Sequence, residues 1–303
     1  MKYIFVVGLP RTGTKLARNV LQNAQHIHCR ISPEIWFFGD LFRSGLRRVT
    51  RKCGNMSNDR NVRKLVEYMY SGKFQHTYWK LLTKGDLGID RKVLESEILQ
   101  SDRSEKAIYV ALMKILAKAD VARAEEKELI IGDKTPGNLY YVPTLVEWFP
   151  DAKVIHTFRD PRAIMASEWK RLVYEGHQGW LSKIGNSFRS VLVVMYITVT
   201  WLYAVKLHHT YSKCYPENYY LSKYEDLVEK PDVSVKKLCN FIGIEADEEM
   251  LSPAKLGSSF AKRSGEGFDK AAINRWQEHL KPWIRVWLSF WSGRYLKEFG
   301  YRL

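Results

Sequence analysis

The distribution of hydrophobic residues predicts four short buried strands. The apolar runs are continuous and rich in β-branched and aromatic residues, and each is followed by a turn signal and a helix-like pattern; they cover residues 3–7, 129–131, 154–158 and 219–221. Runs of this kind are typical of strands that are covered on both faces of a parallel sheet. Strands that alternate with helical patterns predict an α/β fold, with a central, mostly parallel sheet flanked by helices.

The stretch between the first predicted strand and residue 129 has a mainly helical pattern, over about residues 33–126. No linker-like segment and no internal repeat divides the chain. We therefore expect residues 1–303 to form a single domain in which this helical insertion shapes the substrate pocket. From residue 271 the pattern predicts two or three short helices, with breaks at residues 281–282 and 292–293.

The longest apolar run extends from Val191 to Val205 and contains Thr198 and Thr200. It is shorter than a segment that spans a bilayer comfortably, so we expect a buried core helix and no membrane span. At the N-terminus, Lys2 stands directly before the first strand-like run, which leaves no room for a signal peptide or an anchor before the fold. A cytoplasmic protein is the expectation.

The composition limits the classes of binding partner that we expect. The chain has 303 residues, 46% of them hydrophobic, and a formal net charge of +15, which favours anionic partners such as nucleic acid, an acidic membrane surface or a small polyanion. No nucleic-acid-binding module is recognisable, so nucleic acid is disfavoured. Metal-ligand spacing is absent, and no metal is expected. The cysteines form no CxxC pair and predict reduced thiols in the core: Cys29, Cys53, Cys214 and Cys239.

A glycine-containing turn follows the first predicted strand and leads into a helix. Backbone N–H groups in such a turn converge on one point, and the helix dipole adds positive potential, so the turn suits a phosphate. Gly13 permits close backbone approach, and its neighbours offer hydroxyl or cationic groups. These neighbours are Arg11, Thr12, Thr14 and Lys15. A simple turn without a ligand is the alternative.

The turn differs from the phosphate loop of nucleoside triphosphatases, GxxxxGK[ST]. Thr14 follows Gly13 where that loop requires lysine, and Lys15 stands one position later, which turns it about 100° around the helix. Leu16 replaces the magnesium-binding Ser or Thr. An ATP-dependent kinase that uses this loop is an alternative to the interpretation developed below.

A second polar turn follows the strand predicted at residues 154–158. Asp160 and Pro161 mark a helix start, as N-cap and first helical residue. Arg159 then stands at the carboxyl end of a strand, where ligands bind in open parallel sheets, and Ser167 lies two turns into the helix. An arginine and a hydroxyl that converge there suit a second phosphate, although a structural salt bridge explains the arginine equally well.

Together, these motifs resemble those of the sulfotransferase family over nearly the whole chain. Residues 8–14 are similar to its 5′-phosphosulfate loop, and Arg159 with Ser167 to its 3′-phosphate pair. Three further motifs follow in the family's order: Asp133-Lys134-Thr135-Pro136, Tyr224-Glu225-Asp226-Leu227, and Ser258-Ser259-Phe260 with Arg275-Trp276. The resemblance implies a three-layer, P-loop-like fold and transfer of a sulfuryl group from 3′-phosphoadenosine 5′-phosphosulfate (PAPS), which leaves 3′-phosphoadenosine 5′-phosphate (PAP).

The resemblance also implies further contacts to the donor. Tyr224 would help to enclose the nucleotide, and Arg263 would contact the 3′-phosphate or the adenosine. Ser259 is preferred to Ser264 for a contact near the sulfuryl end. One departure concerns the loop, where Lys15 replaces the family's usual Thr or Ser and offers a charge in place of a hydroxyl.

Family branches with an arginine in the loop use a glutamate about twenty residues later to accept the acceptor's proton. Glu34 matches, and it opens an apolar aromatic segment, an environment that favours a carboxylate as a base. The alternative is an acid that stabilises a helix N-terminus after Pro33. Arg11 would stabilise the leaving oxygen, and Lys134 would assist it or instead pair with Asp133.

The sequence does not identify the acceptor. We expect a hydroxyl or an amine of a small molecule, with an intracellular carbohydrate as the alternative. Aromatic side chains gather in the helical insertion, where they would line an apolar pocket or belong to the core. They are Trp36, Phe37, Phe38, Phe42, Tyr68, Tyr70, Phe74, Tyr78 and Trp79.

Overall fold

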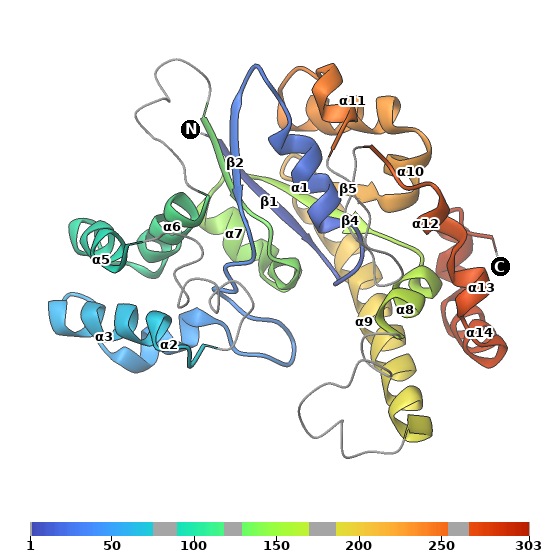
Figure 1. Ribbon diagram of the computed structural model, residues 1–303, viewed down its shortest axis with the longest axis horizontal. Helices are drawn as coiled ribbons and strands as arrows, with labels where there is room; N and C mark the ends of the chain where they lie inside the picture. The colour runs from blue at the N-terminus through green and yellow to red at the C-terminus, as the bar shows by residue number, and fades with distance from the viewer. Residues whose placement is uncertain (1, 75–89, 118–128, 170–185, 254–266, 303) are drawn as a thin grey trace. The chain divides into compact units, whose positions relative to one another are not determined.

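A five-stranded sheet organises the fold, with the strand order β2-β3-β1-β4-β5 (Figure 1). The computed structural model describes residues 2–74, 90–117, 129–169, 186–253 and 267–302. The strands are β1 (Lys2–Gly8), β2 (His28–Ser32), β3 (Leu129–Asp133), β4 (Lys153–Phe158) and β5 (Tyr219–Lys223). The four predicted strands and the α/β class are therefore confirmed.

The hydrophobic pattern missed β2, whose sequence His-Cys-Arg-Ile-Ser mixes polar and apolar residues. β2 pairs in parallel with β3 and sets Ser32 opposite Asp133. β3 also pairs in parallel with β1 and is buried along its whole length. Backbone pairing with a buried neighbour thus makes β2 a strand, although its own side chains show no strand-like pattern.

The chain divides into two compact units, Met1–Val7 with Ala24–Val154, and Gly8–Asn23 with Ile155–Leu303. In the first unit, α3 packs against α2 and α5, and α5 against α6 (Figure 1). The bounds are α2 (Leu46–Cys53), α3 (Asp59–Tyr70), α5 (Arg91–Gln100), α6 (Glu105–Leu116), the 3-10 helix η2 (Pro136–Tyr141) and α7 (Val142–Trp148). The predicted helical character is confirmed for the described residues from 46 onward, whereas residues 33–45 form a loop.

Aromatic side chains form the centre of the first unit's core. The ring of Phe37 lies 5.0 Å from that of Tyr109, and the ring of Phe38 lies 5.3 Å from those of Tyr109 and Trp148. Phe37 and Phe38 therefore belong to the core, whereas Phe42 is 69% exposed. Of the predicted aromatic set, Tyr78 and Trp79 lie outside the described residues.

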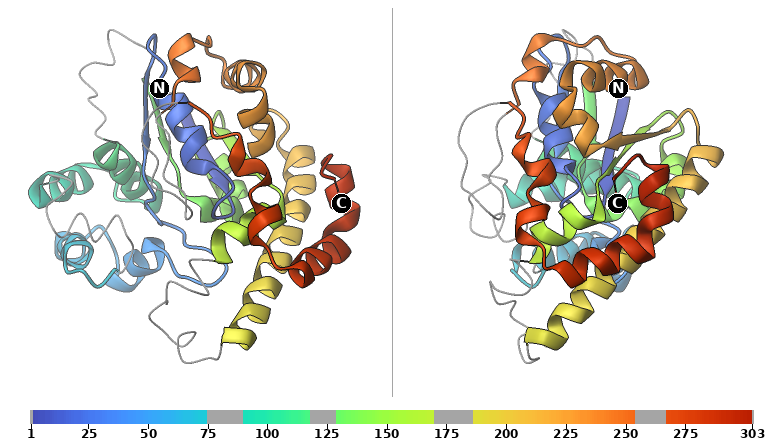
Figure 2. Two further views of the ribbon diagram at one scale, coloured as in Figure 1. Left: turned by 45° about the vertical axis from the view of Figure 1, so that its right-hand side comes forward. Right: turned by 90° about the vertical axis from the view of Figure 1, so that its right-hand side faces the viewer.

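The second unit contains the other helices that the structure describes. They are α1 (Thr14–Gln22), α8 (Pro161–Trp169), α9 (Asn186–Cys214), α10 (Tyr224–Glu229), α11 (Pro231–Ile242), η5 (Glu248–Leu251), α12 (Ala271–Asn274), α13 (Trp276–His279) and α14 (Pro282–Glu298). The helix α9 packs against α8, β5 and α14, and Figure 2 shows α9 and α14 side by side.

The predicted helix break at residues 292–293 is wrong, because α14 continues through both positions. Ile284, Leu288, Ser292 and Leu296 are all buried, at a spacing of four residues. Tertiary packing of this face outweighs the low helix propensity of Ser292 and Gly293. The break at residues 281–282 is confirmed, since Pro282 is the first residue of α14.

The buried core helix predicted at Val191–Val205 is part of α9, which has 29 residues. The prediction is only partly right, because one side of the run is buried while Val191, Met195 and Val199 are exposed. By length and composition α9 is able to cross a membrane, but half of its most apolar window is buried within the protein. The prediction of four core thiols holds for Cys29 and Cys239. It is wrong for Cys53, which is half-buried, and for Cys214, which is exposed near the end of α9.

Candidate active site

The loop that leads into α1 has an unusual backbone. Gly8, Arg11 and Gly13 have φ angles of 149°, 70° and 98°. A Cβ atom added to Gly8 would lie 2.5 Å from the Thr157 carbonyl oxygen, and one added to Gly13 would lie 2.6 Å from Cδ2 of Tyr224. Both glycines are therefore required by close packing as well as by backbone conformation.

Thr12 fixes the centre of the loop. Its buried hydroxyl donates to the Leu9 carbonyl at 2.7 Å and lies 2.8 Å from the Thr157 hydroxyl. Gly13 then begins α1 as an N-cap without a capping side chain. The first N–H groups of the helix are thus not covered by the cap residue, as an anion-binding helix N-terminus requires.

Arg11 links the two predicted phosphate sites. Its Nε donates to Ser167 Oγ at 2.8 Å, and its carbonyl oxygen accepts from Arg159 Nη1 at 3.1 Å. Arg11 Nε also lies 3.5 Å from Oε1 of Glu168, a side chain only 3% exposed. The fold therefore brings Arg11, Arg159 and Ser167 together, with an acid that the sequence did not single out because it occupies an ordinary helical position.

Arg159 is held by an aromatic ring and by main-chain carbonyl groups. Its guanidinium carbon lies 4.0 Å from the Tyr224 ring centre, and its Nη2 donates to the Ala272 carbonyl at 2.7 Å. Its own carbonyl accepts from Trp201 Nε1 at 2.9 Å. Within the described part of the chain, the buried Arg159 Nε has no hydrogen-bond partner. Burial raises the pKa of Glu225, and the charge of Arg159 opposes that rise.

The salt bridge of this turn forms at Arg162. Asp160 Oδ1 accepts from the Arg162 amide at 2.8 Å, which confirms Asp160 as the N-cap of α8. The Arg162 guanidinium pairs with Asp160 Oδ2 at 2.7 Å and lies 4.3 Å from the Trp276 ring centre. The predicted Arg-Trp element therefore contributes Trp276 as a cover for this ion pair.

In the first unit, Glu34 lies in the loop after β2. Lys134 Nζ donates to its Oε1 at 2.8 Å, and Trp36 Nε1 donates to its Oε2 at 3.0 Å. The Glu34 side chain is 26% exposed, whereas that of Lys134 is 4% exposed. The ion pair therefore joins a solvent-accessible carboxylate to a buried ammonium group.

The turn after β3 holds the Glu34 segment in place. The Thr135 hydroxyl accepts from the Ile35 amide at 2.9 Å and from the Trp36 amide at 3.4 Å. The Lys134 amide donates to the Ser32 carbonyl at 3.0 Å. These bonds replace the helix that was one alternative for residues after Pro33, and that alternative is wrong.

Asp133 anchors the same turn from below the surface. Its carboxylate accepts from the Tyr109 hydroxyl at 2.8 Å, from the Thr135 hydroxyl at 2.8 Å and from the Asn138 amide at 2.7 Å. Burial raises the pKa of Asp133 to about 6, and these three donors oppose the rise. Lys134 directs its ammonium to Glu34, so the structure shows the Glu34 pair in place of the alternative Asp133 pair.

Comparison with known sequences identifies the family. A sequence model described as "Sulfotransferase family" matches residues 3–248. The chain belongs to the sulfotransferase family. This sulfotransferase is also 22% identical, over 93% of its length, to an "Uncharacterized protein" of Aquifex aeolicus (strain VF5). It spans only 32% of that relative, about a third of its length.

Several solved structures have the same fold as this sulfotransferase. The "Sulfotransferase Domain from the Curacin Biosynthetic Pathway" is 20% identical with a TM-score of 0.57, over 100% of this chain and 98% of that chain. The "Sulfotransferase Domain from the Synechococcus PCC 7002 Olefin Synthase" is 19% identical with a TM-score of 0.56, over 100% and 96%. A sulfotransferase from Alicyclobacillus acidocaldarius is 14% identical with a TM-score of 0.50, over 100% and 97%. The P-loop-like fold implied by the motifs is thereby confirmed.

The other residues predicted to bind the sulfuryl donor lie in α1 or outside the described residues. Thr14 is buried in the first turn of α1, and Lys15 beside it is exposed. Ser259, Arg263 and the alternative Ser264 lie outside the described residues. In the part of the chain that the structure describes, no three His, Cys, Asp or Glu side chains group as metal ligands.

Proposed function

We propose that this sulfotransferase moves a sulfuryl group from PAPS to a hydroxyl or an amine of a small-molecule acceptor and releases PAP. One observation carries the proposal: Arg11 bonds through its side chain to Ser167 and through its carbonyl to Arg159. A donor with phosphates at both ends of a ribose needs two anion sites in one cluster. The loop and this arginine–serine pair would supply both.

The residues of the cluster fit the donor chemically. The loop N–H groups, with Thr12, Thr14 and Lys15, would hold the 5′-phosphosulfate at the N-terminus of α1. Arg159 and Ser167 would hold the 3′-phosphate, and the buried Arg159 Nε offers a donor group that its present partners do not use. Tyr224 would enclose the nucleotide, with Ser259 and Arg263 as further contacts.

Sulfuryl transfer requires stabilisation of the leaving oxygen and removal of the acceptor's proton. Arg11 would stabilise the leaving oxygen from within the loop. The carboxylate of Glu34 would accept the proton of the acceptor. Lys134 Nζ lies 2.8 Å from Glu34 Oε1 and compensates the carboxylate's negative charge. Lys134 would also help to stabilise the negative charge that develops during transfer. Glu34 is accessible to solvent, as a base that meets a diffusing acceptor must be.

The acceptor is proposed from chemistry alone. A small hydroxylated or aminated metabolite is the first candidate, and an intracellular carbohydrate is the second. A metal–nucleotide loop has lysine directly after its last glycine and Ser or Thr after that lysine. Here Thr14 follows Gly13 and Leu16 follows Lys15, which favours PAPS over ATP. A cytoplasmic location, where PAPS and such acceptors meet, completes the proposal.

The test combines transfer with binding. Purified chain is incubated with radiolabelled PAPS and a panel of alcohols, amines and sugars, and we expect label in an alcohol or an amine. Label in sugars alone would select the carbohydrate alternative. Calorimetry should show PAP binding without magnesium and tighter than ATP binding. Magnesium-dependent ATP binding that exceeds PAP binding would overturn the proposal in favour of a kinase.

A further inference from the structure

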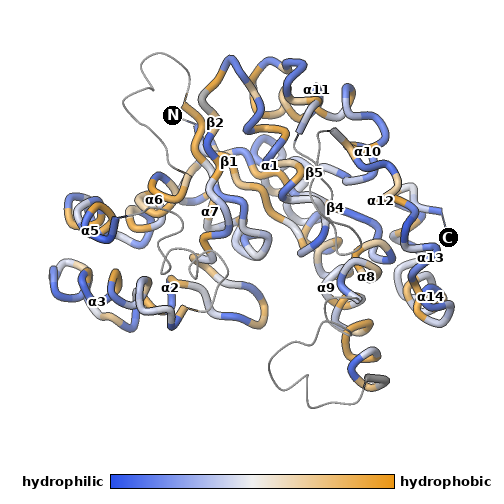
Figure 3. The backbone as a smooth tube through the Cα atoms, in the orientation of Figure 1, coloured by the Kyte–Doolittle hydropathy of each residue, from blue (hydrophilic) through white to orange (hydrophobic). Residues whose placement is uncertain are grey.

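Two helices of the second unit expose large apolar side chains. On α9 most of the exposed residues are spaced by three or four positions, and on α14 they occupy the first three turns. We call this set the apolar face; it consists of Phe188, Val191, Met195, Tyr196, Val199 and Tyr203 on α9 and Trp283, Val286, Phe290 and Trp291 on α14. Figure 3 shows the hydrophobic character along α9. Val199 is 62% exposed and Phe290 is 78% exposed, values far from those of core residues.

The two helices run side by side in the same direction. Trp287 Nε1 of α14 donates to Thr198 Oγ1 of α9 at 3.1 Å. Eleven residues further along each helix, Glu298 Oε1 lies 3.2 Å from His209 Nε2. The N-terminal halves of α9 and α14 therefore adjoin each other, and so do their C-terminal halves (Figure 2). Most of the apolar face lies in the N-terminal halves, and Tyr203 and Trp291 extend it just past the middle of each helix.

The C-terminal halves are basic. Lys206 and Lys213 are exposed on α9, and Arg294 and Lys297 are exposed on α14. The sequence of α9 contains no Asp or Glu, and that of α14 contains only Glu298, which faces His209. An apolar surface therefore passes into a cationic one along a single pair of helices.

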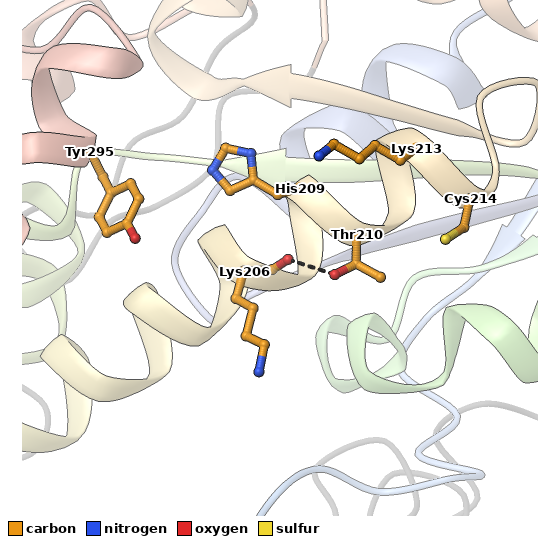
Figure 4. A pocket seen from close by; sticks show the side chains of 6 residues that line it. All are labelled: Lys206, His209, Thr210, Lys213, Cys214 and Tyr295. Carbon is orange, nitrogen blue, oxygen red and sulfur yellow. Dashed lines mark hydrogen bonds between the residues drawn. The ribbon is translucent and has the colours of Figure 1, made fainter.

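A shallow depression lies at the basic end (Figure 4). It has a volume of about 390 Å³, and its lining residues are Lys206, His209, Thr210, Lys213, Cys214 and Tyr295. His209 and Lys213 extend from α9 on the side where Tyr295 of α14 lies. Lys206 extends away from His209 and Lys213, so the depression adds cationic groups on more than one side of α9.

We propose that α9 and α14 dock this protein on the surface of an anionic lipid bilayer. The exposed Trp, Tyr and Phe side chains are of the type that inserts at the boundary between headgroups and acyl chains. The basic ends lie beside them and attract acidic lipids. Charge complementarity thus supports the same occupant as apolar exposure does.

Two other uses of the face fit the structure less well. A second copy would bring two cationic surfaces with almost no acidic groups against each other, which costs electrostatic energy. A membrane-spanning α9 would have to leave the protein, although Trp201, Ala204 and Val205 are at most 1% exposed. Trp201 also donates to the carbonyl of Arg159, so extraction of α9 would remove a support of the donor cluster.

Vesicle flotation tests the proposal with the full chain and no nucleotide. The probes are vesicles of phosphatidylcholine alone and vesicles of which half is phosphatidylglycerol, at low and at high salt. We expect partitioning into anionic vesicles to exceed that into neutral ones by roughly tenfold or more, and to fall as salt rises. Equal partitioning into both vesicle types, or none into either, would overturn the proposal.

Matched variants separate this face from general stickiness. Val199→Ser with Phe290→Ser should weaken partitioning by roughly tenfold or more, because two inserted side chains are lost. The control is Val233→Ser with Phe42→Ser, whose side chains are 52% and 69% exposed elsewhere and which should bind as the wild type. Equal losses in both pairs would overturn the assignment to α9 and α14.

The basic end has its own pair of variants. Lys206→Gln with Lys297→Gln should weaken partitioning into anionic vesicles by roughly fivefold for each lost charge. Lys236→Gln with Lys237→Gln on α11 removes two exposed charges as a control and should change binding little. Sedimentation velocity then measures the oligomeric state. If the wild type forms a dimer and binds no vesicles, and Val199→Ser with Phe290→Ser dissociates that dimer, the apolar face binds a second copy and the proposal is overturned.

This inference stands apart from the proposed activity. Vesicle binding requires neither PAPS nor an acceptor, and the altered residues have no place in the proposed donor cluster or base. Failure of vesicle binding with intact sulfuryl transfer would remove only the membrane proposal. Vesicle binding without transfer or PAP binding would remove only the proposed function.

Discussion

The loop before α1 and the loop that carries Glu34 are both held rigidly, but by different means. The first depends on main-chain packing, since added Cβ atoms on Gly8 and Gly13 would approach neighbours to 2.5 and 2.6 Å. The second depends on side-chain donors and acceptors, with the Thr135 hydroxyl binding two amides and the buried Asp133 carboxylate supporting it. The loop before α1 is therefore sensitive to side-chain volume, whereas the loop that carries Glu34 is sensitive to protonation.

The largest effect is expected at Glu34. Glu34→Gln keeps the size of the side chain but removes the proton acceptor, and kcat should fall roughly 10²- to 10⁴-fold. PAP affinity should not change, because the donor ligands are untouched. Transfer rates at saturating PAPS and calorimetry with PAP measure the two quantities. The exposed Glu97→Gln is the control, and an undiminished rate for Glu34→Gln would show that another group is the base.

A volume test of the loop comes next. Gly13→Ala places a methyl group against Tyr224 at a φ of 98°, and the unfolding free energy should fall by about 3 kcal/mol. Gly300→Ala has a φ of 77° but no atom within 4 Å, and should cost about 1 kcal/mol. Urea denaturation measures both. Equal costs would mean that backbone conformation alone, and not close packing, selects glycine at position 13.

A protonation test addresses the other loop. The pKa of Asp133 is raised from 3.8 to about 6, so at pH 5 the folded chain holds a proton that the unfolded chain has mostly released. This group alone should therefore lower the free energy of unfolding by an amount on the order of 2 kcal/mol between pH 4 and pH 7.

Asp133→Asn removes that titration and isolates its contribution. The variant loses an acceptor for several donors and should be less stable than the wild type at pH 4, by about 1 to 3 kcal/mol. Its deficit should shrink as pH rises to 7, because only the wild type pays for ionising the buried carboxyl. Unfolding free energies at both pH values measure this, with the exposed Asp232→Asn as control. A constant deficit would contradict the raised pKa of Asp133.

The smallest effect is expected for a conservative change in the donor cluster. Arg159→Lys keeps the charge but loses the fork that reaches both the Arg11 and the Ala272 carbonyls. PAP affinity should fall roughly tenfold, and calorimetry measures it. Arg63→Lys, at an exposed ion pair, should leave PAP affinity as it is. Unchanged affinity for Arg159→Lys would show that the fork does not bind the 3′-phosphate.

The sequence predicted the parts of the site that are encoded locally. Gly13, Asp160 and Pro161 stand where a strand turns into a helix, and short-range rules for turns and caps apply there. Contacts between distant segments were not predictable in this way. The hydrogen bond from the Ile35 amide to Thr135 joins residues 100 positions apart, and that from Trp201 to Arg159 joins residues 42 apart.

Two errors have the same origin. β2 is a strand because β3 offers it hydrogen bonds, and residues after Pro33 are not helical because Thr135 takes the Ile35 and Trp36 amides. In each case a partner far along the chain decides the local conformation, and propensity is overruled. The sequence did not predict a role for Glu168 for a related reason, since only folding brings its carboxylate close to Arg11.

Tyr224 connects three positions that sequence motifs treat separately. Its ring limits position 13 to glycine and lies 4.0 Å from the guanidinium carbon of Arg159. A smaller residue at 224 would relieve the first constraint and remove the second contact at once. Substitutions at these three positions are therefore epistatic: their effects on stability and on donor affinity will not add, and relatives should vary at them in concert.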